Sequence, residues 1–213
     1  MSRQRAAAMP ASRQGGAAAG SRRAKSGPGR AKRGWAMGLL AGGGALAGLA
    51  VVLVLALGGV HSTPATGIGA LAPDGAFTTV AGTSESVASL RGRPTLLWFV
   101  STWCSSCQAG TQAMAGNIAT LAARNVRVVE LELADDLGQP GPAIGDFGRQ
   151  LAGPAYGNPD WTFGVASAGL TRAYDAAGYL DVYYLLDPSG HIVYINSSPA
   201  STMASLLAQT SRL

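Results

Sequence analysis

The sequence predicts one mixed α/β domain that follows a single membrane-spanning helix. Three observations support this prediction. Residues 35–60 are 26 consecutive residues without a charge, and a helix of that length, about 39 Å, can cross a hydrocarbon core of about 30 Å. Residues 95–100 form an uninterrupted apolar run, which is typical of a strand covered on both faces. Further helix-like and strand-like stretches alternate up to the C-terminus.

The N-terminal segment is basic and low in complexity. Residues 1–34 hold nine basic side chains and no acidic one, whereas residues 61–213 carry seven basic and eleven acidic side chains. Because residues 1–34 contain few large apolar side chains, we expect them to be disordered. A nucleic-acid-binding domain needs basic and aromatic residues clustered on a folded face, so we do not expect nucleic acid as a partner.

The charge distribution predicts how residues 35–60 are oriented. The stretch lacks the polar face of a core helix and exceeds the apolar region of a cleaved signal peptide, about 7–15 residues. We interpret it as an uncleaved signal anchor in the plasma membrane. The basic residues before it hold the N-terminus in the cytoplasm, so the C-terminal part is expected to be extracytoplasmic. Residues 61–73, rich in small residues, Pro and Gly, are the expected tether, and residues 74–213 the folded domain.

The hydrophobic pattern of the folded part predicts the order of its elements. The expected elements are short edge elements at 77–80 and 85–90, a strand at 95–100, a helix at 102–123, a strand at 126–133, an irregular stretch at 134–164 with a short helix at 144–151, a helix at 166–177, strands at 182–186 and 191–195, and a helix at 201–213. The turn sequence Asp-Pro-Ser-Gly at 187–190 predicts that the last two strands form an antiparallel hairpin.

The two cysteines of the chain lie in the motif Cys104-Ser-Ser-Cys107, between the buried strand and the following helix. At a helix N-terminus, free N–H groups and the helix dipole stabilise a thiolate. A second thiol one turn further can attack the mixed disulfide that the first one forms. We therefore predict two-step thiol–disulfide exchange. A structural disulfide in so short a loop would be strained, and no further Cys or suitable His pair completes a zinc site.

The chain also resembles a known family in three stretches around this motif. The matching stretches are Ser-Leu-Arg-Gly-Arg-Pro at 89–94, Leu-Trp-Phe-Val-Ser-Thr-Trp-Cys-Ser-Ser-Cys at 97–107 and Tyr-Leu-Leu-Asp-Pro-Ser-Gly-His-Ile-Val at 184–193. They resemble the membrane-anchored, thioredoxin-like thiol:disulfide oxidoreductases of the TlpA type. The resemblance implies a thioredoxin-like fold, with a central mixed sheet flanked by helices, and no cofactor. It implies protein thiols and disulfides as partners, with a membrane electron donor or acceptor. By the resemblance, Cys104 would be the exposed nucleophile, Cys107 the resolving thiol and Trp103 the aromatic residue beside them.

Three positions depart from the pattern of that family. Its cis-proline, six residues before the Asp of the hairpin turn, is replaced by Asp181. Glu and Pro in the helix after the motif are replaced by Gly110 and Gln112, and Trp98 stands where thioredoxins carry a buried carboxylate. The expected substrate-groove residues are Trp103, Leu180 and Asp181. The carboxylate of Asp181 either lies beside the cysteines or points to solvent.

Two other functions stay open. A thioredoxin-like copper chaperone would bind copper(I) through two thiolates and a distal His. However, that class has a longer spacing between its cysteines, and the His residues here, His61 and His191, lie in the tether and after the turn. A redox-inactive binding module is favoured by the missing cis-proline and disfavoured by the intact cysteine pair. Whether the enzyme reduces, oxidises or isomerises disulfides depends on its potential and its electron partner.

Several other polar and aromatic residues are assigned structural roles. The adjacent acids Asp135 and Asp136 are expected to point apart and face solvent, and His191 is expected to be exposed. Four aromatic residues are expected to pack in the core and the sheet rather than bind a ligand. They are Trp161, Tyr174, Tyr183 and Tyr184.

Overall fold

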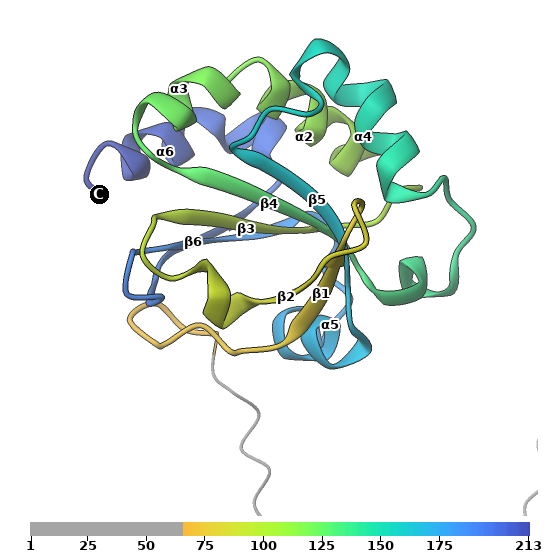
Figure 1. Ribbon diagram of the computed structural model, residues 1–213, viewed down its shortest axis with the longest axis horizontal. Coiled ribbons are helices and arrows are strands. Elements are labelled where there is room, and N and C mark those ends of the chain that lie inside the picture. Colours follow the sequence, from red (N-terminus) through yellow and green to blue (C-terminus); the bar gives the residue numbers. More distant parts are fainter. Residues whose placement is uncertain (1–65) are drawn as a thin grey trace, which may run out of the picture. The chain divides into compact units, whose positions relative to one another are not determined.

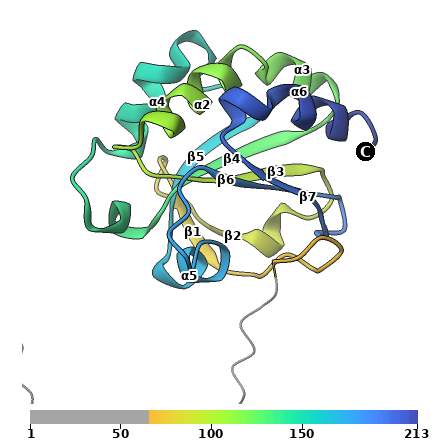
Figure 2. The same cartoon turned by 180° about the vertical axis from the view of Figure 1, so that it is seen from behind.

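The computed structural model describes residues 66–213, which form a seven-stranded mixed sheet with helices on both faces (Figure 1). Helices α2, α3, α4 and α6 cover one face, and α5 lies on the other, as the view from behind also shows (Figure 2). The predicted tail at 1–34, the predicted span at 35–60 and the first part of the tether lie outside the described residues. Within residues 66–213, no helix combines the length and the apolar character needed to cross a membrane.

The sheet has the strand order β2-β1-β5-β4-β3-β6-β7. The strands are β1 (Ala76–Thr79), β2 (Ser84–Ser86), β3 (Thr95–Val100), β4 (Arg127–Glu132), β5 (Trp161–Ala166), β6 (Val182–Leu186) and β7 (Ile192–Ser197). The helices are α2 (Ser105–Ala115), α3 (Ile118–Ala123), α4 (Ile144–Ala152), α5 (Ala168–Tyr174) and α6 (Pro199–Thr210), with 3₁₀ turns at Val87–Leu90, Ala134–Gly138 and Gly153–Ala155. Strands β3, β4 and β5 are parallel, and the other pairings are antiparallel.

Strand β3 is the centre of the core, as its apolar run predicts. All six of its residues are buried, and successive side chains point to opposite faces of a sheet. Trp98 therefore packs under the helices on one face, and Leu97 and Phe99 join the apolar cluster on the other. The four aromatic residues assigned to packing are buried in these two clusters, which confirms that prediction.

Three predicted elements differ from the observed ones. The helix expected at 102–123 is two helices, because the chain turns at Gly116 and Asn117, where the Asn117 side chain donates to the carbonyl of Ala113. Strand β5 begins inside the stretch expected to be irregular, 134–164, and ends at Ala166. Gly164 in its centre allows the backbone of β1 to approach, since a Cβ there would lie 2.7 Å from the Thr78 carbonyl oxygen. The edge element expected at 85–90 is only partly strand and continues as a 3₁₀ turn.

Residues 66–73, part of the expected tether, pack against the domain and form hydrogen bonds with it. The amide of Gly69 donates to the carbonyl of Ile192 at 2.7 Å, and the amide of Ile192 donates to the carbonyl of Ala70 at 2.9 Å. Ala72 is buried. The ordered domain therefore begins before residue 74, and this part of the expected tether lies along the start of β7.

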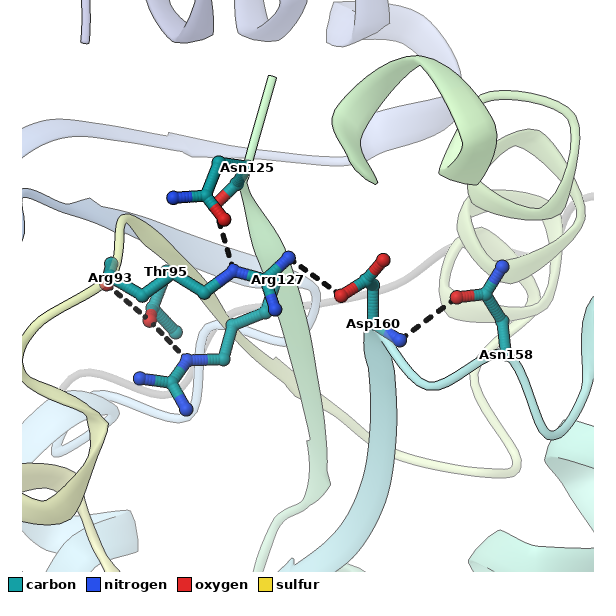
Figure 3. Close-up of polar contacts among 6 residues, drawn as sticks. All are labelled: Arg93, Thr95, Asn125, Arg127, Asn158 and Asp160. Atoms are coloured by element: carbon teal, nitrogen blue, oxygen red, sulfur yellow. Dashed lines mark hydrogen bonds and ion pairs between the residues drawn. The ribbon is translucent and has the colours of Figure 1, made fainter. Parts of the chain in front are cut away.

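Polar contacts tie together the beginnings of the three parallel strands (Figure 3). Arg93 forms an ion pair with Asp160 at 2.6 Å and donates through Nε to the carbonyl of Asn125 at 2.8 Å. Arg127 donates through Nε to the hydroxyl of Thr95 at 2.9 Å. These contacts join the segments that begin β3, β4 and β5, so the opposite ends of the same strands also meet at one edge. That edge carries the cysteine motif.

Candidate active site

Cys104 lies at the junction predicted from the sequence, after β3 and directly before α2. It is the N-cap residue of α2, with extended backbone angles, and its Sγ accepts a hydrogen bond from the amide of Cys107 at 3.4 Å. The hydroxyl of Ser106 lies 3.1 Å from the same sulfur atom. Both cysteines are free thiols in the structure. The prediction of one thiol capping the helix and one a turn further is confirmed.

The two thiols differ in burial, but less than expected. The exposed fraction is 7% for Cys104 and zero for Cys107. The expectation of an exposed Cys104 is wrong for this structure, because its side chain joins the apolar cluster under α2. Burial, the hydrogen bond with Cys104 and the negative charge of Asp181 together raise the pKa of the Cys107 thiol. Cys107 is therefore a protonated thiol at neutral pH.

Asp181 lies beside the cysteines and does not point to solvent, so the structure selects the first of the two positions that the sequence left open. Strand β6 runs antiparallel to β3 and pairs Val182 with Phe99, so the residue before β6 reaches the edge where β3 ends. Asp181 is 1% exposed and accepts a hydrogen bond through Oδ1 from the Trp98 indole at 3.0 Å. Its Oδ2 makes no hydrogen bond within the described residues. Burial raises the pKa of Asp181, although the Ser106 and Ser198 hydroxyls and the Trp98 indole act in the opposite direction.

A second buried carboxylate, Glu130, was not singled out by sequence reasoning. It lies in β4 in register with Trp98 of β3, on the same face of the sheet. Its Oε1 accepts from the Thr111 hydroxyl at 2.7 Å and its Oε2 from the Trp161 indole at 3.2 Å. Burial raises the pKa of Glu130 to about 8. The domain therefore does hold a carboxyl group under α2, supplied by the strand beside the expected one. An acidic residue in the centre of a strand predicted to be largely apolar is the signal that could have identified it.

Asp136 corrects the expectation that both adjacent acids face solvent. Asp135 is exposed, but Asp136 is buried. The Asp136 carboxylate accepts from the Thr102 amide at 2.9 Å and from the Thr102 hydroxyl at 2.6 Å, and its carbonyl accepts from the Trp103 indole at 2.9 Å. The segment after β4 thus contacts both residues that precede Cys104. The pairing depends on where the chain folds back, which the residue pattern alone does not show.

The two remaining groove candidates are more accessible. Trp103 is 39% exposed next to Cys104. Leu180 lines a largely apolar cavity of about 570 Å³ between the loop that ends at Asp181 and the strands β6 and β7. The other lining residues are Gly178, Tyr179, Val182, Ile195, Asn196 and Ser197. Trp103, Leu180 and Asp181 therefore all belong to segments at the edge of the sheet where Cys104 lies.

His191 lies at the other end of the sheet. The hairpin turn before it follows Leu186, which pairs with Thr95 at the start of β3, whereas Cys104 follows the end of that strand. Six strand residues correspond to roughly 20 Å. The side chain is exposed, as expected, and its Nδ1 lies 2.9 Å from the Ser189 hydroxyl. Residues 66–213 contain no group of three or more potential His, Cys, Asp or Glu ligands close enough for one metal ion.

Comparisons with known proteins identify the fold of the domain. Residues 68–140 match the sequence profile described as the AhpC/TSA family. No curated protein matches the chain. A Bacteroides thetaiotaomicron structure, provisionally named a protein disulfide isomerase, aligns with a TM-score of 0.53 and 20% identity over 68% of this chain and 88% of that one.

Two further similar structures are those of a disulfide oxidoreductase and of a copper-bound protein. A secreted disulfide oxidoreductase of Mycobacterium tuberculosis aligns with a TM-score of 0.50 and 22% identity over 65% of this chain and 95% of that one. Copper-bound ScoI of Arabidopsis thaliana aligns with a TM-score of 0.50 and 17% identity over 67% and 99%. At these identities the likeness concerns the fold. The domain has a thioredoxin-like α/β fold with a mixed sheet, as the resemblance in the sequence implies.

Proposed function

We propose that this protein exchanges disulfides with protein partners through Cys104 and Cys107, and that it acts mainly as a reductant. The proposal rests on one observation above all. A free thiol caps the helix, and a second, fully buried thiol lies one turn inside it with its amide on the sulfur of the first. This arrangement separates the thiol that can meet a substrate from the thiol that can act only within the molecule.

The reaction follows from these positions. The Cys104 thiolate attacks one sulfur of a substrate disulfide, a mixed disulfide forms, and the other substrate sulfur leaves as a thiolate. Cys107 then loses its proton and attacks the Cys104 sulfur, which releases the second substrate sulfur. Two electrons have passed to the substrate, and Cys104 and Cys107 are joined as a disulfide. An external dithiol donor, which we expect to be membrane-bound, reduces this pair again.

Asp181 is the group we propose as acceptor of the Cys107 proton. It is a buried carboxylate whose charge acts on Cys107, and its Oδ2 has no hydrogen-bond partner within the described residues. An ionised carboxylate with a raised pKa accepts a proton more readily than an ordinary one, and it can release that proton again in each cycle. Asp181 thereby combines this role with the place that the cis-proline occupies in the resembling family.

The reducing direction is supported by the charges around the motif in the part of the chain that the structure describes. Helix α2 carries no charged side chain, and the nearby carboxylate of Asp181 disfavours a thiolate at Cys107. A dithiol whose reduced form is stabilised as thiolate is oxidising, as in DsbA at about −120 mV, whereas thioredoxin is reducing at about −270 mV. We expect this pair to lie nearer the thioredoxin value.

The proposed location is the outer side of the plasma membrane. Its support is the uncharged stretch at 35–60, preceded by nine basic side chains. Outside the cytoplasm, partner proteins carry disulfides that a reductase can act on.

The reduction potential of the full chain in mild detergent tests the proposal. Equilibration with glutathione buffers should give a reversible two-electron couple nearer about −270 mV than about −120 mV. A pair that cannot be cycled contradicts the exchange reaction and favours the redox-inactive binding module. Anaerobic loading with copper(I) is the parallel measurement. Copper retained by the wild type but not by Cys104→Ser would favour the copper chaperone, although His191 is too far away to serve as the distal ligand.

A further inference from the structure

The segment that follows β4 has an unusual backbone. Asp135, Asp136 and Leu137 have φ values of 54°, 47° and 56°, and Gly138 follows with 76°. Consecutive left-handed residues are disfavoured when they carry a Cβ atom, because the Cβ approaches the following carbonyl oxygen. Such a turn persists only where contacts elsewhere hold it, and turns of this kind are concentrated at functional sites.

The contacts that hold this turn are made to the cysteine motif. Both carboxylate oxygens of Asp136 bind Thr102, one through the amide and one through the hydroxyl, and the Asp136 carbonyl accepts from the Trp103 indole. Three hydrogen bonds therefore connect one buried residue to the two residues before Cys104. Asp135, the neighbour with the same charge and a similar backbone, is exposed and makes none of these contacts.

Gly141 shows how closely the segment is fitted to the motif. A Cβ atom at this position would lie 2.2 Å from the Thr102 hydroxyl oxygen and 2.3 Å from Asp136 Oδ2. Any side chain there would separate the very atoms that form the shortest of the three hydrogen bonds. The chain thus passes over the Thr102–Asp136 contact and shields it from solvent. Away from solvent, hydrogen bonds to a charged group are stronger.

We propose that Asp136 is a positioning residue for thiol–disulfide exchange, one that fixes Thr102 and Trp103 so that protein substrates meet Cys104 in a reactive geometry. The inference rests on the proposed function and deepens it. Cys104 continues directly from the two anchored residues, and the exposed part of Trp103, its neighbour in the chain, is apolar surface that a substrate polypeptide can contact. Without the Asp136 carboxylate, the amide and hydroxyl of Thr102 lose their acceptors, and the backbone before Cys104 loses its anchor. The turn that carries the carbonyl acceptor of the Trp103 indole also loses the contacts that hold it in place.

The kinetic consequence differs between large and small substrates. A protein substrate needs both the Cys104 sulfur and the surface around it in place. Misplacement of bound reactants by about 1 Å is costly, so the KM for a protein substrate should rise about tenfold when the Thr102–Asp136 contact is lost. A small disulfide such as oxidised dithiothreitol needs only access to the sulfur, and its rate should change less than about twofold.

The test compares the full chain with Asp136→Ala, Thr102→Val, Gly141→Ala and the matched control Asp135→Ala, all in mild detergent. Each is assayed with insulin as the protein disulfide and with oxidised dithiothreitol as the small one, after circular dichroism has confirmed folding. Thr102→Val replaces the hydroxyl by a methyl group of similar size and leaves the Asp136 side chain in place, so it carries the test if Asp136→Ala fails to fold. We expect a raised KM for insulin in the three variants at the contact, with Asp135→Ala matching the wild type.

Two results would overturn the inference. One is insulin kinetics in Thr102→Val and Asp136→Ala that match Asp135→Ala. The other is an equal loss with insulin and with dithiothreitol, which would mean that Asp136 supports the fold or the thiol in general and not the meeting with protein substrates. A wild-type protein that reduces neither substrate is a different failure, because it contradicts the proposed function itself.

Discussion

Replacing Glu130 by Gln should make the stability of the protein less dependent on pH. Glu130 is fully buried, and its pKa is raised from an ordinary value of 4.5 to about 8. Between these two pH values the folded protein binds a proton that the unfolded chain has released. Stability therefore falls as the pH rises from the lower value to the higher one, and is constant again above it. Each pH unit in that window costs about 1.4 kcal/mol, or about 5 kcal/mol in all.

Gln is a close mimic of the protonated acid. Its amide can donate to the Thr111 hydroxyl, whose own proton then goes to the Cys107 carbonyl 3.0 Å away. Its carbonyl accepts from the Trp161 indole, as the carboxyl group of Glu130 does. The variant should match the wild type at about pH 4 and exceed it by up to about 5 kcal/mol near pH 9, a large share of a typical stability of about 5–15 kcal/mol.

The assay is urea unfolding of the full chain, followed by tryptophan fluorescence across this pH range. The quantity to compare is the difference between variant and wild type, because the other titrating groups cancel in it. Glu85→Gln in the edge strand β2 makes the same chemical change outside the core and should run parallel to the wild type. A Glu130→Gln curve that also runs parallel would show that the carboxyl group is not held protonated, and would refute the reasoning from burial.

Three further predictions concern the site and its location. Asp181→Asn should change the pH profile of the resolving step by Cys107, because it removes both a negative charge that raises the pKa of Cys107 and the proposed acceptor of its proton; an unchanged profile would contradict this. Gly110→Ala should lower the free energy of unfolding by about 1–3 kcal/mol despite its better helix propensity, since the new Cβ would lie 2.7 Å from the Trp98 ring; unchanged urea unfolding would contradict the close packing. A reporter fused to Leu213 that is active only in an oxidising compartment should give signal, and signal from a cytoplasmic reporter instead would overturn the proposed location.

The features that the sequence predicts well depend on neighbours along the chain. Residues 95–100 are recognisable as a buried strand because every residue is apolar or small. The hairpin of β6 and β7 follows from the turn sequence between them. Cys104 begins a helix because a buried strand ends four residues earlier and helix-forming residues follow.

The features that the sequence does not predict depend on how distant strands align. Glu130 joins the site because β4 places it in register with Trp98 of β3, although two helices separate these strands in the chain. Asp136 does so because a left-handed turn directs its carboxylate towards Thr102. Asp181 is predicted in part. Counting back from the hairpin turn locates its position in the chain, but only the fold shows that its side chain is buried and does not face solvent.

The division of roles between the two cysteines is tested most directly by trapping. The measurement is a non-reducing gel of membranes from cells that produce the Cys107→Ser or the Cys104→Ser variant, with the adducts identified by mass spectrometry. Cys107→Ser should accumulate mixed disulfides on Cys104, because the resolving thiol is gone. Cys104→Ser should trap nothing, because Cys107 has no exposed surface with which to meet a bulky partner. Equal trapping by both variants, or adducts from Cys104→Ser alone, would contradict the proposed exchange mechanism.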